Sequence, residues 1–290
     1  MKHRSKSERI FQAGIYLFMA VVVLITICPL WYIFAASLSG AAEVVQGRVV
    51  FWFRDFSLDA YRRALQTDYV GLSYLNTIFY TIFGTALSML LTILGSYALS
   101  KPRLHGRKFF MLFICLTMWF PAGLMPTYLT YQNLNLVDTR LGILLCGAVS
   151  SVYVIILRTY FESVPASIEE SARLDGASEL RVLWSVYLPL SAAPLMTLTL
   201  YYMVLRWNGY FWTMILIKDE SKISLQVLLT KLIITLQGYE ETMGMIDTAA
   251  YSNQTLVYAT IVVSVVPILL VYPYIQKYFV SGMTLGAVKG

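Results

Sequence analysis

The sequence concentrates its most distinctive side chains in one segment, 164–189, which lies between two long apolar stretches. Pro165 and Ser167 predict a helix start, because the Ser167 hydroxyl can cap the first turn and Glu170 can reach back to complete a capping box. Such a helix would carry its charges on one side and small or apolar residues on the other. Contact with another protein is the chemistry that this arrangement suggests.

The same segment is predicted to form two helices. Asp175 and Gly176 break the first helix, and a second helix is expected from Ala177 toward Tyr187, until Pro189 introduces the next apolar stretch. The apolar face of this helix-turn-helix is larger than a solvated loop requires, which favours a docking site for another protein. An ordinary amphipathic loop with an Asp-Gly turn is the alternative.

This pattern resembles the EAA loop of permease subunits from ATP-binding cassette (ABC) importers, in which Glu-Ala-Ala is followed at fixed spacing by Gly and by Leu-Pro. Ser171 replaces the first Ala and Val186 replaces an Ile, and both changes are conservative in size. The resemblance implies that residues 168–178 form a coupling helix in a cleft of a cytoplasmic ATPase, with Glu170 facing that partner and Gly176 allowing the turn. The matching residues are Glu170, Ala172, Gly176, Leu188 and Pro189, and the implied coupling set is Glu169, Glu170, Ser171, Ala172, Asp175, Gly176, Ala177, Leu188 and Pro189.

Residues 276–290 resemble the C-terminus of the smaller six-span permease of maltose-type carbohydrate importers, within the binding-protein-dependent transport family. The resemblance implies a tail along the ATPase dimer interface, formed by Gly286, Val288, Lys289 and Gly290. Three further segments resemble the same group of permeases, namely Asn76-Thr77, 134–142 and Trp207-Asn208. The similarity therefore covers most of 72–290. The first 71 residues resemble it in general layout only.

A second candidate site lies within an apolar stretch around Arg206. An ionisable group inside a membrane span is costly and usually faces a partner or a water-filled path. We expect Arg206, Trp207, Asn208 and Tyr210 to line a translocation path, because aromatic rings and an amide can stack on and bond to sugars. Arg206 would then favour an acidic saccharide such as a uronate oligomer. The alternative, and the commoner role of intramembrane charges, is that Arg206 pairs structurally with a neighbouring subunit while the aromatic rings pack.

Other kinds of site lack the residues that they need. The sequence has no Gly-x-x-x-x-Gly-Lys-Ser/Thr phosphate loop, so ATP and Mg²⁺ are expected on a separate ATPase and this chain is not expected to be an enzyme. His3 and His105 both lie in basic segments, which leaves no ready histidine zinc site or catalytic triad. The three cysteines lie in apolar stretches, where they behave as small hydrophobes. No bound cofactor, metal or disulfide framework is expected.

Membrane spans are the elements that must position these residues. Hydrophobic residues make up 58% of the chain and charged residues 13%, against roughly 45–50% and about 25% in soluble domains. Six uncharged stretches reach the roughly 17 residues that a helix needs to cross a bilayer, and none alternates as the strands of a β-barrel do. We expect an all-α membrane protein, of the type I ABC importer permease fold that the resemblance implies, with spans near 12–38, 72–100, 108–131, 140–161, 190–217 and 255–281.

The distribution of charge orients these spans. Lys and Arg mark cytoplasmic loops, and the loops on the two sides of the predicted membrane carry net charges of +7 and −2. The +7 side includes both termini, which are therefore expected in the cytoplasm of a prokaryotic cell, with the chain crossing the cell membrane several times. The basic residues lie in short loops rather than in an aromatic-laced patch, so no nucleic-acid partner is expected.

The chain is expected to form one membrane domain with three parts: residues 1–71, the permease core 72–281 with its coupling loop 162–189, and the tail 282–290. The resemblance implies one permease of an ATP-driven, binding-protein-dependent importer of sugars or oligosaccharides, embedded in the lipid bilayer. Its implied partners are a second permease in a heterodimer, a dimeric ATPase and an extracytoplasmic solute-binding protein. An ion- or proton-driven secondary carrier is the alternative, although such a carrier should bury acids at mid-membrane, and all sixteen Asp and Glu residues lie in the head or the loops.

Two further features carry weaker expectations. The external loop 218–254, and within it 237–244, corresponds by position to the loop that reaches into the solute-binding protein in maltose-type importers. Pro121, Pro126 and Pro194 interrupt predicted spans and are expected to kink them, with packing irregularity as the alternative reason.

Overall fold

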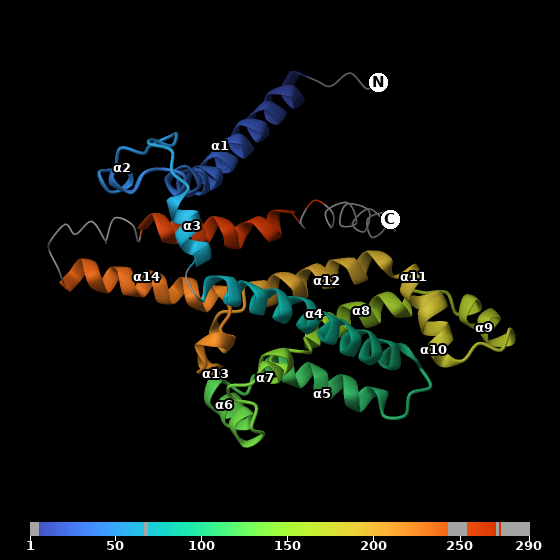
Figure 1. Ribbon diagram of the computed structural model, residues 1–290. Coiled ribbons are helices and arrows are strands. Elements are labelled where there is room, and N and C mark those ends of the chain that lie inside the picture. Colours follow the sequence, from blue (N-terminus) through green and yellow to red (C-terminus); the bar gives the residue numbers. More distant parts are fainter. Residues whose placement is uncertain (1–5, 67–68, 243–253, 271–272, 274–290) are drawn as a thin grey trace. The chain divides into compact units, whose positions relative to one another are not determined.

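The computed structural model describes residues 6–66, 69–242, 254–270 and 273, and in these residues the chain is helical (Figure 1). Within the same residues, β-type backbone pairing is limited to one isolated antiparallel bridge between Ser39 and Phe56. The prediction of an all-helical chain is confirmed. Two compact units can be distinguished, residues 1–70 with 229–266 and residues 71–228 with 267–290, and each is described by itself.

The first unit is built around one long apolar helix. Most side chains of Phe11–Ser37 are exposed, as expected of a helix whose partner is lipid or another chain. Its last turns pack through Ala35 and Ala36 onto the following segment, and Trp31 Nε1 donates a hydrogen bond to the Phe51 carbonyl at 2.7 Å. The helices of this unit are α1 (Lys6–Ser37), α2 (Ala41–Val45) and α3 (Asp59–Gln66).

The second unit holds both candidate sites and consists of a long helix with several shorter ones. Its long helix is α4 (Val70–Ser100), whose first residue belongs to the other unit. The shorter helices are α5 (Arg107–Trp119), α6 (Leu124–Asn133), α7 (Arg140–Leu145), α8 (Ser151–Glu162), α9 (Ala166–Leu174), α10 (Glu179–Val182), a π-helical turn (Leu183–Tyr187), α11 (Leu188–Leu190), α12 (Ala192–Trp207) and α13 (Phe211–Leu216), followed by α14 (Leu225–Thr242), which crosses into the first unit.

Among the residues that the structure describes, two helices are long and apolar enough to cross a membrane, Phe11–Ser37 of α1 and α4. The number rises to four if each of two bent pairs is one span: α5 with α6, bent by 117°, and Glu179–Leu190 with α12, bent by 87°. Within the described residues, the predicted spans 108–131, 140–161 and 190–217 are each interrupted within their length. The sixth predicted stretch is represented in the described residues by the shorter apolar helix Gln254–Leu270.

Proline explains one of these interruptions. Pro121 lies in the break between α5 and α6, where its missing N–H and its ring are incompatible with a continuous helix. Pro126 and Pro194 each occupy the first turn of the helix that follows a bend, of 117° before α6 and of 87° before α12. A backbone N–H in the first turn has no partner within the helix, so proline is tolerated there.

Helix α4 presents a buried polar face along its whole length. Small hydroxyl side chains recur on it every three or four residues, which lets neighbouring helices approach closely and bond to it. Thr77 Oγ1, for example, accepts a hydrogen bond from the backbone of Leu225 at 2.8 Å, and Ser96 donates to the Val154 carbonyl at 2.9 Å. The members of this face are Ser73, Thr77, Thr81, Thr85, Ser88, Thr92, Ser96 and Ser100.

Candidate functional site

Helix α9 forms the first half of the coupling segment, the name used here for residues 162–189. It begins at Ala166, with Pro165 before it and no side-chain cap, so the predicted capping box is wrong. The early start places Ser167 inside the first turn, where its hydroxyl cannot act as the cap. Glu170 is exposed on this helix and forms no ion pair with the residues that the structure describes.

The turn after α9 depends on Gly176. Its φ of +78° lies in the left-handed region, and its backbone N–H donates to the Arg173 carbonyl at 2.9 Å. Ala177 N–H donates to the Ala172 carbonyl at 3.0 Å, which closes the helix end. The second helix was predicted from Ala177 but begins at Glu179, because Ser178 serves as its cap. A π-helical turn and α11 then continue to Leu190, and an 87° bend precedes α12.

Glu169 points inward, onto its own chain. Lys101 Nζ, just beyond the end of α4, lies 2.6 Å from Glu169 Oε2, and Tyr187 donates its hydroxyl hydrogen to the same oxygen at 2.5 Å. Arg173 Nη2, one turn along α9, lies 2.7 Å from Glu169 Oε1. The side chains of Lys101 and Glu169 are 8% and 16% exposed, so this ion pair is largely shielded from solvent.

Two aromatic rings enclose the Lys101 ammonium. Its Nζ lies 4.3 Å from the centre of the Tyr97 ring and 3.8 Å from that of Tyr187, within the range of cation–π attraction. An outer ion pair joins Arg103 to Glu179, which also accepts a hydrogen bond from the Tyr97 hydroxyl at 3.0 Å. We call Lys101, Glu169, Tyr97 and Tyr187 the Lys101 cluster. It connects the end of α4 to both helices of the coupling segment.

These contacts shift the titration of both ionised groups. Partial burial would raise the pKa of Glu169, but hydrogen bonds from Lys101, Tyr187 and Arg173 outweigh it and lower that pKa to about 2. Burial lowers the pKa of Lys101, and the bond to Glu169 opposes that change. The carboxylate is therefore ionised at neutral pH, which keeps the pair intact.

The predicted coupling residues divide between two faces of the segment. Ala172, Ala177 and Leu188 pack against the core that Leu157, Phe161 and Leu183 help to form. Glu170, Ser171, Asp175, Gly176 and Pro189 are exposed. Large apolar side chains are exposed in the same segment, with Leu174 at 89% and Leu180 and Trp184 at 63% each. The coupling segment thus combines an anchored inner face with an apolar outer face.

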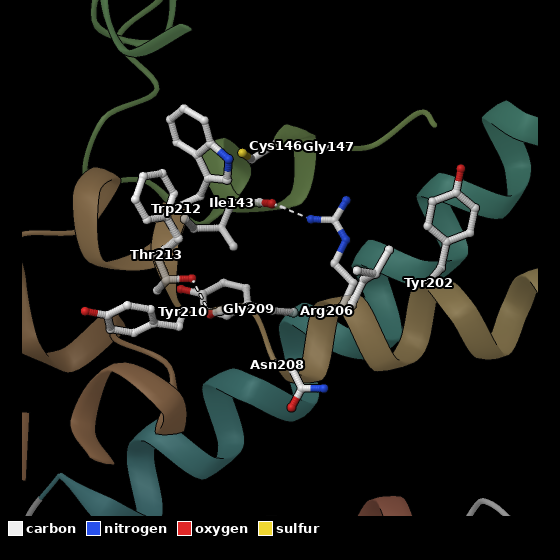
Figure 2. Close-up of a pocket in the computed structure, with 13 residues that line it drawn as sticks. Ile143, Cys146, Gly147, Tyr202, Arg206, Asn208, Gly209, Tyr210, Trp212 and Thr213 are labelled. Carbon is white, nitrogen blue, oxygen red and sulfur yellow. Dashed lines mark hydrogen bonds between the residues drawn. The ribbon is translucent and has the colours of Figure 1, made fainter. Parts of the chain in front are cut away.

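The second candidate site surrounds a cavity of about 330 Å³ near the C-terminal end of α12 (Figure 2). The cavity reaches the size range of small-ligand pockets. Three of the four predicted path residues line it, namely Arg206, Asn208 and Tyr210. Trp207 does not line this cavity. Its side chain is buried, packs edge to face on Tyr74 and lines a separate apolar cavity.

The three lining residues extend in different directions. Figure 2 shows Arg206 directed toward Ile143 and Asn208 on the opposite side of the chain. Tyr210 donates its hydroxyl hydrogen to Met214 Sδ at 2.8 Å. Arg206 donates to the carbonyls of Ile143 and Leu144 and to Ser88 Oγ, at 2.7, 3.0 and 3.2 Å. Among the residues that the structure describes, the hydrogen-bond partners of Arg206 are therefore neutral groups of the same chain.

Hydrogen bonds also join other residues that resemble the maltose-type permeases, in a polar junction around Asn76 and Asp138. Asn76 Nδ2 donates to the carbonyls of Ser221 and Ile223 at 2.8 and 3.2 Å, and Arg140 Nη2 donates to Asn76 Oδ1 at 3.1 Å. Asp138 Oδ1 accepts the backbone N–H groups of Lys218 and Asp219 at 3.2 and 3.0 Å. This junction fixes the segment 218–225 to the start of α4 and to the loop before α7.

Sequence reasoning missed the partners of both sites. Lys101 stands at the end of a long uncharged stretch, which could have marked it as a charge held near a buried surface. Gly84, Ser88 and Thr92 are spaced four residues apart on α4 and match the spacing of Tyr202 and Arg206 on α12, a pattern that could have paired the two helices. The tail residues Gly286, Val288, Lys289 and Gly290 lie outside the described residues. Of the segment 237–244, positions 243 and 244 also lie outside them, and the earlier positions belong to the end of α14.

Comparisons with known proteins identify the family of this chain. A family model described as "binding-protein-dependent transport system inner membrane component" matches residues 1–285. The polygalacturonan/rhamnogalacturonan transport system permease protein YtcP of Bacillus subtilis is 38% identical over 284 residues, which are 98% of this chain and 99% of that protein. Protein LplC of the same organism is 36% identical over 289 residues, 99% of this chain and 98% of LplC.

A solved structure also matches. A chain in the crystal structure of a bacterial ABC transporter involved in the import of the acidic polysaccharide alginate superposes with a TM-score of 0.88 and 43% sequence identity, covering 96% of this chain and 100% of that one. The type I importer permease fold predicted from the resemblance is supported by this match.

Proposed function

Because the chain belongs to the family of binding-protein-dependent transport system inner membrane components, we propose that it is one of two transmembrane permeases of an ATP-driven importer of acidic oligosaccharides. Its relatives are transport permeases rather than enzymes. They favour this function over an ion- or proton-driven carrier. ATP and Mg²⁺ would bind to a separate dimeric ATPase, and a solute-binding protein would deliver the saccharide from outside.

The observation that carries this proposal is the two-faced coupling segment. Its inner face is fixed to α4 through the 2.6 Å contact between Lys101 and Glu169, whereas Leu174 and Trp184 are left exposed. An exposed apolar surface on a short rigid helix pair is suited to insertion into a cleft of a partner. We assign residues 168–178 as the helix that enters the ATPase, with Glu170 directed toward it.

The substrate class follows from the relatives. YtcP is named for polygalacturonan and rhamnogalacturonan, and the structural neighbour belongs to an importer of the acidic polysaccharide alginate. A polymer of galacturonate carries a carboxylate on each sugar, so it is an acidic polysaccharide too. We place the passage of such a saccharide at the cavity lined by Arg206, Asn208 and Tyr210.

The remaining parts of the assembly follow the same reasoning. We propose six spans with both termini in the cytoplasm, because the loops on that side carry the excess of Lys and Arg. A second, different permease would complete the path. The tail residues Gly286, Val288, Lys289 and Gly290 are assigned to the ATPase interface by resemblance to maltose-type permeases.

The Lys101 cluster suggests how the parts move together. Closure of the ATPase dimer on ATP would displace α9, and the contact of Glu169 with Lys101 would carry that displacement to the end of α4. The spans would then rock as rigid bodies and open the path toward the binding protein.

The proposal is tested by isolating the tagged chain from native membranes and identifying the proteins that accompany it. We expect an ATPase, a second permease and a solute-binding protein. Glu170→Arg and Gly176→Pro should insert normally but lose the ATPase, since the first reverses a charge on the docking face and proline cannot adopt the φ of +78° at the turn. Asp59→Arg, at an exposed site on α3, is the matched control and should retain all partners. Recovery of the ATPase at wild-type yield with both variants would remove the coupling assignment.

A further inference from the structure

Helices α7 and α8 are separated by an interruption, residues 146–150, and this interruption borders the cavity. Gly147 has a φ of +61°, and the last carbonyls of α7 have no partner within their own helix. Ile143 is buried, so water cannot readily satisfy its carbonyl. Within a membrane, an interruption of this kind persists only where other groups bond to the freed backbone.

Two side chains of α12 supply these bonds. Arg206 donates from Nη1 to the Ile143 carbonyl at 2.7 Å and from Nη2 to the Leu144 carbonyl at 3.0 Å, which caps the end of α7. Tyr202, one turn earlier on α12, accepts the Ser150 backbone N–H at 3.1 Å, at the start of α8. One face of α12 therefore binds both ends of the interruption.

Helix α4 is shaped to receive the same two side chains. Ser88 Oγ accepts from Arg206 Nη2 at 3.2 Å, and the Thr92 and Tyr202 hydroxyls lie 2.8 Å apart. A Cβ atom at Gly84 would lie 2.9 Å from Arg206 Nε, so a side chain there would displace the guanidinium. We call Gly84, Ser88, Thr92, Tyr202 and Arg206 the Arg206 bridge.

The bridge leaves Arg206 without a free edge for a carboxylate. Bidentate binding uses two parallel N–H groups, either of Nε with Nη2 or of Nη1 with Nη2. Nη2 belongs to both edges, and it already donates to Leu144 and Ser88. A substrate carboxylate would have to break these bonds before it could bind in the usual fork geometry.

We propose that Arg206 is a positioning residue, which holds the interruption between α7 and α8 open as one wall of the passage and does not bind the carboxylate of the saccharide. Ile143, Cys146 and Gly147 line the cavity from the interruption, and Tyr202 and Arg206 line it from the bridge. The shape of this wall thus depends on the geometry of the guanidinium rather than on its charge. The proposal rests on the proposed function for its transport measurement only.

Cys146 provides a reporter on the wall itself. The test uses the assembled complex with Cys28 and Cys115 replaced by Ser, so that Cys146 is the one thiol of this chain. Labelling by N-ethylmaleimide is followed on this chain by mass spectrometry, and saccharide import is measured in proteoliposomes. Arg206→Gln and Gly84→Val should each raise the labelling rate about tenfold, equivalent to about 1.4 kcal/mol, and lower kcat with KM unchanged. Gly95→Val is the matched control, because a Cβ atom there meets no atom within 4 Å.

Two milder variants keep the test decisive if the first ones fail to assemble. Arg206→Lys retains the charge but not the fork, and should behave like Arg206→Gln. Tyr202→Phe removes the acceptor at Ser150 and should raise labelling by a smaller factor. Wild-type labelling and import by Arg206→Lys would overturn the proposal, as would a raised KM in Arg206→Gln that Gly84→Val does not share. If the complex imports no saccharide at all, the proposed function fails, while the labelling rates still decide the role of Arg206.

Discussion

Lys101 and Arg206 are both basic residues held against α4, yet their charges are compensated by different means. Lys101, beyond the end of the helix, is buried beside the carboxylate of Glu169 and two tyrosine rings. Arg206 reaches the middle of the helix beside Gly84, and its recorded partners are two backbone carbonyls and the hydroxyl of Ser88. Among the described residues it forms no ion pair.

Because the two charges are compensated differently, the two contacts are broken by different changes. An ammonium is a point charge that needs a counter-charge but little directionality, whereas a guanidinium distributes its donors in a rigid fork. The attachment of the coupling segment therefore depends on charge, and the wall of the cavity depends on geometry. A charge pair can tolerate small displacements of the coupling segment, as its proposed role in transmitting movement requires.

The largest effect is expected from removing the counter-charge of Lys101. Glu169→Gln keeps the shape of the side chain but leaves a shielded ammonium unpaired, which should lower the free energy of unfolding by about 3 kcal/mol. The double variant Lys101→Met with Glu169→Gln should recover to within about 1 kcal/mol of wild type, because neutral groups replace a buried pair with little loss. Denaturant titration in detergent micelles measures both.

The exposed pair of Arg48 and Glu43 is the control for this prediction. Its side chains are 57% and 23% exposed, and its removal should change stability by less than about 1 kcal/mol. Equal losses at the two pairs would mean that burial does not strengthen the Lys101 contact, and additive losses in the double variant would mean that the two charges are not coupled.

Exchanging the two basic residue types gives a smaller and asymmetric effect. Arg206→Lys should lower the free energy of unfolding by about 2 kcal/mol, because one ammonium cannot satisfy two carbonyls and a hydroxyl together. Lys101→Arg should lower it by less than about 1 kcal/mol, since a guanidinium can pair with Glu169 and stack on the tyrosine rings. The same denaturant titration measures both variants, and equal losses would contradict the distinction between charge and geometry.

The sequence predicted the helical class and the position of the coupling segment because those depend on local composition and spacing. Gly176 in the left-handed region and the helix on either side of it follow from the Asp-Gly turn. The interruption at 146–150 was not predictable in this way. Its stretch has no proline or charge from 141 to 157, and the bonds that maintain it come from α12, about sixty positions away.

The same limit applies to the roles of individual site residues. Glu169 and Glu170 are adjacent and chemically identical, yet one faces Lys101 and the other is exposed, because the packing of α9 decides which side each occupies. Likewise Arg206 and Trp207 are neighbours on α12 that line separate cavities. Spacing within one helix places such residues on different faces, but the neighbouring helices determine what each face meets.

The smallest effect is expected from mild acid, which should change the contribution of the Lys101 contact to stability but not that of the Arg206 contacts. Glu169 has a pKa lowered from 4.5 to about 2, so its contribution is present above pH 4.5 and is lost as the pH falls toward 2. The stability difference between wild type and Glu169→Gln should shrink by about 0.2 kcal/mol from pH 7 to 5 and by about 0.8 kcal/mol at pH 4. The difference between wild type and Arg206→Gln should stay constant over this range, because a guanidinium does not titrate there and its recorded acceptors are neutral. Unfolding titrations of the three proteins at pH 7, 5 and 4 would measure both differences. A parallel decline of the two would show that the Arg206 bridge depends on an ionised carboxylate after all.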